Sequence, residues 1–178
     1  MNATQAAGGA GASPALASCR KGLARIDGVS RIAVVAAMAA MTGLVVGQVF
    51  FRYALASSID WAEEMARLAF VWAIFLALPH GIRSGIHVGI DVVVVRFPAI
   101  WQDRLFRLSA ALGAVLMAVL LFYGWQVTQD SWPELMPTLD VTAAVYYIPV
   151  LIAAAHGLLH LALLAWGGSA TWAQEPRP

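Results

Sequence analysis

The stretch IAVVAAMAAMTGLVVGQVFF, residues 32–51, decides the fold of this chain, because it runs without a charge from Arg31 to Arg52. An α-helix needs about 20 apolar residues to cross the hydrocarbon core of a bilayer, which is about 30 Å thick. The stretch has that length and predicts a membrane-spanning helix over residues 32–52.

The composition extends this interpretation to the whole chain. The 178 residues are 61% hydrophobic and 12% charged, and the mean hydropathy is +0.74, whereas soluble domains are about 45–50% apolar and about 25% charged. The formal net charge of +1 provides no basic field for nucleic acid. The single cysteine, Cys19, excludes an intramolecular disulfide framework. The sequence therefore predicts an all-α integral membrane protein.

Three further apolar segments predict spans over residues 61–82, 108–128 and 141–166, and the last of them contains Pro149. Residues 86–107 alternate charges with Val, Ile, Phe and Trp and contain no uncharged run of spanning length. Such a pattern is typical of an amphipathic segment that lies in the membrane interface. We expect four transmembrane helices, with this interfacial segment between the second and the third.

The two ends of the chain differ from the four-helix membrane domain, which we place at residues 20–168. Residues 1–19 are small and uncharged and offer little to bury, which predicts a disordered tail. Residues 169–178 form a short C-terminal tail.

Lys and Arg gather on the cytoplasmic side of membrane proteins. They flank the first span on its N-terminal side and fill the connection between spans two and three, as Arg20, Lys21, Arg25, Arg31, Arg83, Arg96, Arg104 and Arg107. Both termini are therefore expected in the cytoplasm.

Small residues recur every four positions in two of the predicted spans. Ala39, Gly43 and Gly47 form one stripe, and such stripes allow a second helix to approach closely. The third span carries another at Ala110, Ala114 and Ala118. Each stripe is either a packing seam or the ordinary small-residue content of a membrane helix.

Ionised side chains stand at the start of the second span, in SSIDWAEEMARLAFVW at residues 57–72. Asp60 suits an N-cap, and Glu63 three positions later completes a capping box. Glu63 and Glu64 lie four and three positions before Arg67, so both carboxylates can reach its guanidinium. The group is either a local cap with ion pairs or a contact with a neighbouring helix or another subunit. If one arginine serves two acids, Arg67→Ala costs more than replacing either glutamate.

Histidines raise a different possibility. His156 and His160 are one helical turn apart, and His80 is expected at a similar depth, so haem ligation between two spans is geometrically open. The alternative is that these imidazoles are hydrogen-bonded within the helix packing. His87 and Asp91 are four apart, and a carboxylate there can orient the imidazole, but no nucleophile or third ligand accompanies them. We expect no catalytic residue, no bound cofactor and no metal site.

Three segments carry a family resemblance: VGQVFFRY at 46–53, IDWAEEMARLAFVWAIFLA at 59–77 and GIRSGIHVGIDVVV at 81–94. They resemble the small membrane subunit of tripartite ATP-independent periplasmic (TRAP) transporters, the DctQ-like small permease family. The family's pattern falls on Arg52, Tyr53, Trp61, Glu63, Glu64, Arg67, His87 and Asp91. These are the candidate residues for subunit contacts or for a structural motif.

The resemblance covers about residues 25–165 and implies a multi-pass protein of the bacterial inner membrane. It implies an accessory scaffold that joins a large permease subunit, which carries the solute and sodium pathway, while a soluble periplasmic binding protein delivers the substrate. The expected process is sodium-coupled uptake of organic acids, such as dicarboxylates, with no ion site in this chain. Two rivals stay open: a haem-binding membrane anchor of a quinone-linked oxidoreductase, and a free-standing small channel or exporter.

Overall fold

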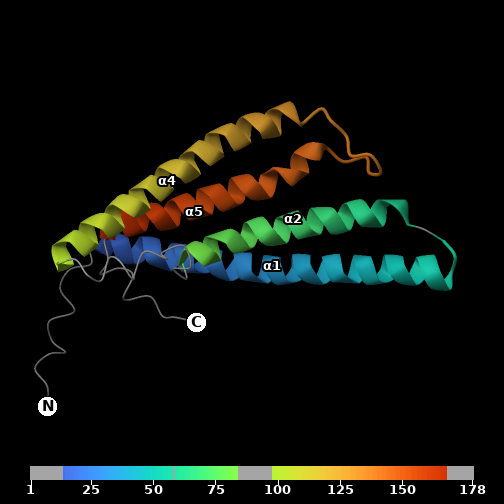
Figure 1. Cartoon of the computed structure of the whole chain (residues 1–178), viewed down its shortest axis with the longest axis horizontal. Helices are drawn as coiled ribbons and strands as arrows, with labels where there is room; N and C mark the ends of the chain where they lie inside the picture. The colour runs from blue at the N-terminus through green and yellow to red at the C-terminus, as the bar shows by residue number, and fades with distance from the viewer. Residues whose placement is uncertain (1–13, 58, 84–97, 168–178) are drawn as a thin grey trace, which may run out of the picture.

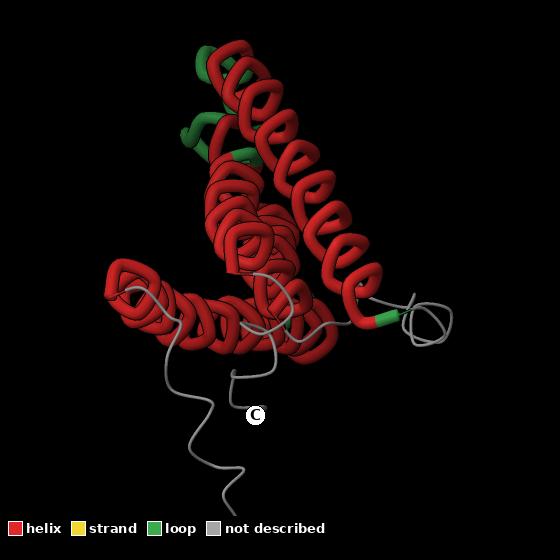
Figure 2. Tube along the Cα trace, turned by 90° about the vertical axis from the view of Figure 1, so that its left-hand side faces the viewer, coloured by secondary structure: helices red, strands yellow, loops and turns green. Residues whose placement is uncertain are grey.

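The computed structural model of the protein describes residues 14–57, 59–83 and 98–167. Figure 2 shows helix along most of these residues, with loops at the turns. Its elements are α1 (Pro14–Ala54), α2 (Asp60–Arg83), α4 (Ala99–Asp130), the short 3₁₀ helix η2 (Ala143–Tyr146) and α5 (Ile148–Gly167). The prediction of an all-helical protein is confirmed for the described residues.

Two antiparallel helix pairs make up the bundle. α1 packs along α2, α4 packs along α5, and contacts between α2 and α5 join the pairs (Figure 1). The first turns of α4 and the early part of α1 lie at one end, which we call the basic end (residues 22–31 and 101–107). The two connections at 55–59 and 131–142 lie at the opposite end, which we call the loop end.

Three helical stretches of the described chain are long and apolar enough to cross a membrane: Gly22–Ala54, Trp101–Asp130 and Ala143–Trp166. They correspond to the first, third and fourth predicted spans. The second predicted span coincides with α2, which has 24 residues but carries acids in its first turn and a proline in its interior. Ionised side chains lower the apolarity of its first two turns.

The first helix is longer than the first predicted span. α1 begins at Pro14, so residues 14–19, expected to belong to a disordered tail, are helical. Proline suits the first position of a helix because its missing N–H would have no partner there. Residues 1–13 and the predicted C-terminal tail at 169–178 lie outside the described residues.

The end of the predicted interfacial segment is also helical. Residues 99–107 are the first turns of α4 and continue without a break into the third span. Two local contacts stabilise them: Arg107 Nε lies 2.7 Å from Asp103 Oδ2, one turn away, and the Arg104 guanidinium lies 5.6 Å from the centre of the Trp101 ring system. The earlier part of that segment, 86–97, lies outside the described residues.

Pro149 lies inside the fourth span, as predicted, and it occupies the first turn of α5, where the N–H that proline lacks would have no partner within the helix. The fourth span is interrupted before it. η2 ends at Tyr146, and α5 starts at Ile148. Thr142 caps η2 by accepting a hydrogen bond from the backbone N–H of Ala144. The span is therefore a 3₁₀ turn followed by an α-helix.

Pro79 lies in the interior of α2, and its side chain is fully buried. A proline there leaves the carbonyl four residues earlier without its helical donor, and side chains of neighbouring helices commonly compensate in membranes. Ser30 on α1 donates a buried hydrogen bond of 2.9 Å to the carbonyl of Leu76, within the same turn. This hydrogen bond joins α1 to α2 in the turn that precedes Pro79.

Close approach between α4 and α5 depends on two glycines. A Cβ added at Gly113 would lie 3.1 Å from Leu161 Cδ1, and one added at Gly124 would lie 3.1 Å from Leu151 Cδ2. Ala110, the first residue of the third-span stripe, is buried. Around Gly43 and Gly47 of the first-span stripe a Cβ would meet nothing within 4 Å. Among the described residues, that stripe is not a seam within the chain.

We predict that Gly113→Val destabilises the bundle, whereas Gly43→Val does not. Valine at Gly113 forces Leu161 away from α4, and overpacking of this kind costs about 1–3 kcal/mol. The midpoint of thermal unfolding of the detergent-solubilised chain, followed by size-exclusion chromatography, measures the effect. Equal midpoints for the two variants would contradict the close α4–α5 contact.

Candidate functional site

The motif residues of α2 lie in its first two turns, at the loop end. The helix includes Asp60 itself, one position further in than an N-cap, and Asp60 and Glu63 are the acids of its first turn. Acidic side chains are favourable there because the helix macrodipole is positive at its N-terminus.

Glu63 and Arg67 form an ion pair one helical turn apart. Arg67 Nη2 lies 3.2 Å from Glu63 Oε1, and the two side chains are 63% and 70% exposed. An exposed pair with this spacing contributes about 0.3–0.5 kcal/mol, because water and salt screen it. The pair is a surface feature of the loop end.

Glu64 takes no part in that pair, which corrects the expectation that Arg67 holds both carboxylates. Its side chain is buried and points to the side of α2 opposite Ala62 and Ala66, given about 100° per residue. Glu64 Oε2 accepts hydrogen bonds from the backbone N–H of Thr138, at 2.9 Å, and from the Thr138 hydroxyl. The buried acid therefore binds the loop that precedes the last helix.

Two more hydrogen bonds hold η2 against α2. The Tyr146 hydroxyl donates to the backbone carbonyl of Glu64 at 3.3 Å, and Trp72 Nε1 donates to the carbonyl of Val145 at 3.2 Å. We call Glu64, Thr138, Tyr146, Trp72 and Val145 the Glu64 junction. It joins α2 to the loop at Thr138 and to η2, both more than 70 residues later in the sequence than their partners on α2.

The loop that supplies Thr138 is itself folded. Met136 is buried, its N–H donates to the carbonyl of Val141 at 2.9 Å, and the N–H of Ala143 donates to the carbonyl of Glu134 at 2.8 Å. The acids of this segment, Asp130, Glu134 and Asp140, are exposed. The loop end therefore presents an ordered, acidic surface.

The other predicted site residues lie apart from the Glu64 junction or outside the described residues. Arg52 and Tyr53 are in the last turn of α1, and Tyr53 and Trp61 are exposed. Within the described ranges no hydrogen bond or ion pair links these three side chains to Glu64. His87 and Asp91 lie outside the described residues.

A second buried cluster was not anticipated from the sequence. Asp27 on α1 lies between α5 histidines: the Nε2 atoms of His156 and His160 are 2.8 and 3.0 Å from its Oδ1 atom. All three side chains are buried. The available signal was the spacing of Leu23, Asp27 and Ser30, which repeats on one helix face, and all three are buried in the structure. We call Asp27, His156 and His160 the Asp27 cluster.

The Asp27 cluster bears directly on the haem hypothesis. Both imidazoles of α5 that haem ligation requires are directed at one carboxylate oxygen. The His80 ring packs edge-on against His156, with ring centres 6.2 Å apart. The alternative expectation, that His156 and His160 are hydrogen-bonded within the packing, is confirmed.

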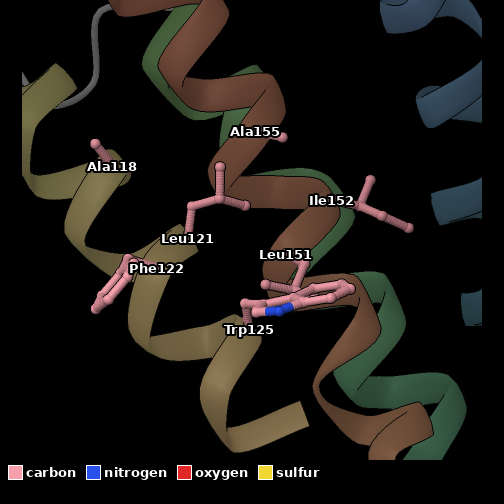
Figure 3. A pocket seen from close by; sticks show the side chains of 7 residues that line it. All are labelled: Ala118, Leu121, Phe122, Trp125, Leu151, Ile152 and Ala155. Carbon is pink, nitrogen blue, oxygen red and sulfur yellow. The ribbon is translucent and has the colours of Figure 1, made fainter. Parts of the chain in front are cut away.

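One groove lies on the side of the bundle between α4 and α5 (Figure 3). It has a volume of about 640 Å³, and its lining side chains are Ala118, Leu121, Phe122, Trp125, Leu151, Ile152 and Ala155. None of them is charged, so the groove offers no cation to an organic anion. Its chemistry suits acyl chains or an apolar helix.

These features define a helical membrane protein whose two buried acids, in the part of the chain that the structure describes, are each bound by another segment of the same chain. Comparison with known proteins places it further. Residues 41–172 match the family described as tripartite ATP-independent periplasmic transporters, DctQ component. The chain belongs to this family, which consists of transporter components, and is a small permease subunit.

Several relatives have related names. The isethionate TRAP transporter permease protein DctMQ of Oleidesulfovibrio alaskensis is 29% identical over 139 residues, which are 73% of this chain and 21% of that protein. The C4-dicarboxylate TRAP transporter small permease protein DctQ of Vibrio cholerae is 28% identical over 114 residues, 61% of this chain and 49% of that protein. A putative TRAP transporter small permease protein of Haemophilus influenzae is 26% identical over 124 residues, 70% of this chain and 73% of that protein. The match thus spans about a fifth of the first relative and about half of the second.

We predict that Glu64→Ala is the most damaging single change in the motif, ahead of Glu63→Ala and Arg67→Ala. It removes two hydrogen bonds to a charged acceptor, worth about 1.5–3 kcal/mol each, whereas the exposed pair contributes less than 1 kcal/mol. Thermal unfolding in detergent measures all three. Glu64→Gln is the matched control, and it retains part of the stability because its amide oxygen still accepts from Thr138. If Arg67→Ala lowers the midpoint most, the shared-arginine interpretation is right instead.

Proposed function

We propose that this chain is a fixed scaffold for a large permease subunit in binding-protein-dependent uptake of organic acids, coupled to sodium, across the bacterial inner membrane. The observation that carries the proposal is the engagement of the buried acids. Glu64 is bound by Thr138, and Asp27 faces His156 and His160. A buried carboxylate that another segment of the same chain engages in this way is part of the framework of the fold, and it needs no solute to satisfy it.

The proposed partner is supported by the length of one relative. The region matched in DctMQ makes up 21% of that protein, which leaves ample chain for a much larger permease part. The binding protein would dock at the loop end, where the exposed acids Asp130, Glu134 and Asp140 lie.

The proposed class of solute follows from the names of the relatives. Isethionate is an organic sulfonate, and the C4-dicarboxylates are organic acids with two carboxylates. Both are small anions. The apolar groove between α4 and α5 cannot bind such an anion, so the solute pathway belongs to the large subunit. The haem-anchor alternative is not favoured by the family match.

The proposed topology has four spans, with α2 as the second and both termini in the cytoplasm. α2 is 24 residues long, about 36 Å at 1.5 Å per residue, which is enough to cross. Its charged first turns lie at the loop end, beside the acidic loop, where they reach the headgroup level. Arg25, Arg31, Arg104 and Arg107 gather at the basic end, which supports a cytoplasmic location for it.

Uptake into proteoliposomes tests the scaffold function. The chain is reconstituted alone, with the large permease encoded in the same organism, and with that permease plus its binding protein, and labelled succinate and isethionate are the probes. We expect sodium-dependent uptake of one of them only with all three components. Equal uptake by the chain alone would show that it is a channel or carrier itself.

The lone native cysteine allows a direct test of topology. Cys19 is exposed, and an impermeant maleimide added to intact spheroplasts should leave it unlabelled. In a Cys19→Ser background, Ser57→Cys and Asp140→Cys should be labelled from outside, and Arg104→Cys only after the cells are opened. Labelling of both Ser57→Cys and Arg104→Cys from outside would exclude α2 as a span.

A further inference from the structure

We propose that Asp27, His156 and His160 form a binding site for a divalent transition-metal ion of the zinc type, which links α1 to α5. The sequence led us to expect no metal site in this chain. The three side chains come from the two ends of the sequence, yet their ligand atoms all lie within 4.8 Å of one another. All three are buried.

The atoms that converge are the ones that a metal ion needs. His156 Nε2 and His160 Nε2 lie 2.8 and 3.0 Å from Asp27 Oδ1. In tetrahedral zinc sites the ion lies about 2.0–2.2 Å from such atoms, so the ligand atoms are about 3.3–3.5 Å apart. The two histidine nitrogens therefore need to move away from Asp27 Oδ1 by less than about 1 Å, and all the ligand atoms already lie within 4.8 Å of one another.

The hydrogen-bonded arrangement and the metal-bound arrangement are closely related. If both imidazoles are neutral and donate to one oxygen, both carry their proton on Nε2. To bind an ion through Nε2, each neutral imidazole transfers its proton from Nε2 to Nδ1, which frees the Nε2 lone pair and keeps the ring neutral. With two neutral imidazoles, the carboxylate gives the three side chains a charge of −1. A bound divalent ion changes this charge to +1. Occupancy therefore does not increase the magnitude of the charge that the bundle buries.

The ligand set indicates which ions fit. Two imidazole nitrogens and one carboxylate oxygen suit zinc and its neighbours in the transition series, whereas magnesium and calcium prefer oxygen ligands. His156 and His160 are four apart on α5, with ring centres 5.0 Å apart, and two histidines one turn apart on a helix are a common zinc-binding arrangement. Three protein ligands leave a position for water.

The location gives the ion a path and a structural role. Asp27 lies between Arg25 and Arg31 at the basic end, where both arginines are exposed, so the site is close to the membrane surface. α1 and α5 touch only over a short stretch, compared with the long contacts within each helix pair. A metal ion held by both helices would fasten the first span to the last.

Zinc binding to the full-length chain in detergent, with any affinity tag removed, tests the proposal. The chain is stripped with a chelator, given zinc chloride alone, freed of unbound ion on a desalting column and analysed for metal by mass spectrometry. We expect one zinc per wild-type chain. Asp27→Asn and His160→Gln should weaken binding by more than about tenfold, because each removes a direct ligand. His87→Ala is the matched control and should keep the ion.

The wild-type chain decides the matter even if the variants fail to fold. A wild-type chain that retains no zinc shows that the cluster is a hydrogen-bonded contact only. If it retains zinc, X-ray absorption at the zinc edge should show two imidazole ligands. A spectrum with fewer, or loss of the ion in His87→Ala, places the zinc elsewhere and overturns the proposal.

Discussion

A carboxylate removed from water has to find hydrogen-bond donors inside the protein, because an uncompensated buried charge costs several kcal/mol. Among the residues that the structure describes, two carboxylates are buried, Glu64 at the loop end and Asp27 near the basic end. Neither is served by its own helix alone. Thr138 lies 74 residues from Glu64, and His156 lies 129 residues from Asp27. Each acid therefore accepts hydrogen bonds from, or faces donors of, the last third of the chain, and the two contacts fix the two helix pairs relative to each other at both ends.

Between these two contacts, the helices are held together by close packing and not by buried charges. Apolar side chains in a bilayer gain little by leaving lipid for protein, so helix association there depends on close packing. Gly113 and Gly124 let α5 leucines approach α4, and the Ser30 hydroxyl strengthens α2 beside Pro79. The polar contacts at the two ends act together with this packing in setting the register of the helices.

Local patterns in the sequence predicted the helices well, because an uncharged run of spanning length has few other stable conformations in a membrane. They failed where the decisive partner is distant. Arg67 is the nearest cation to Glu64 in sequence, and so it seemed the natural partner, but the folded loop brings Thr138 to Glu64 instead. Asp27 lies between Arg25 and Arg31, so its local sequence is that of a basic flank. The charge pattern of residues 86–107 does not predict the extension of α4 to Ala99, because Asp103 and Arg107 fit an interfacial segment as well as a helical ion pair.

The two buried acids also stand differently with respect to the family. The family match begins at residue 41, so Glu64 and both histidines fall within it, whereas Asp27 precedes it. The family match thus covers the Glu64 junction and two of the three residues of the Asp27 cluster. A subunit that supports a larger transporter benefits from a rigid structure, because a neighbouring subunit can move relative to the support only if the support keeps its own shape. The Glu64 junction supplies that rigidity at the loop end, and at the basic end this chain achieves it by directing an aspartate from its first helix at two histidines of its last.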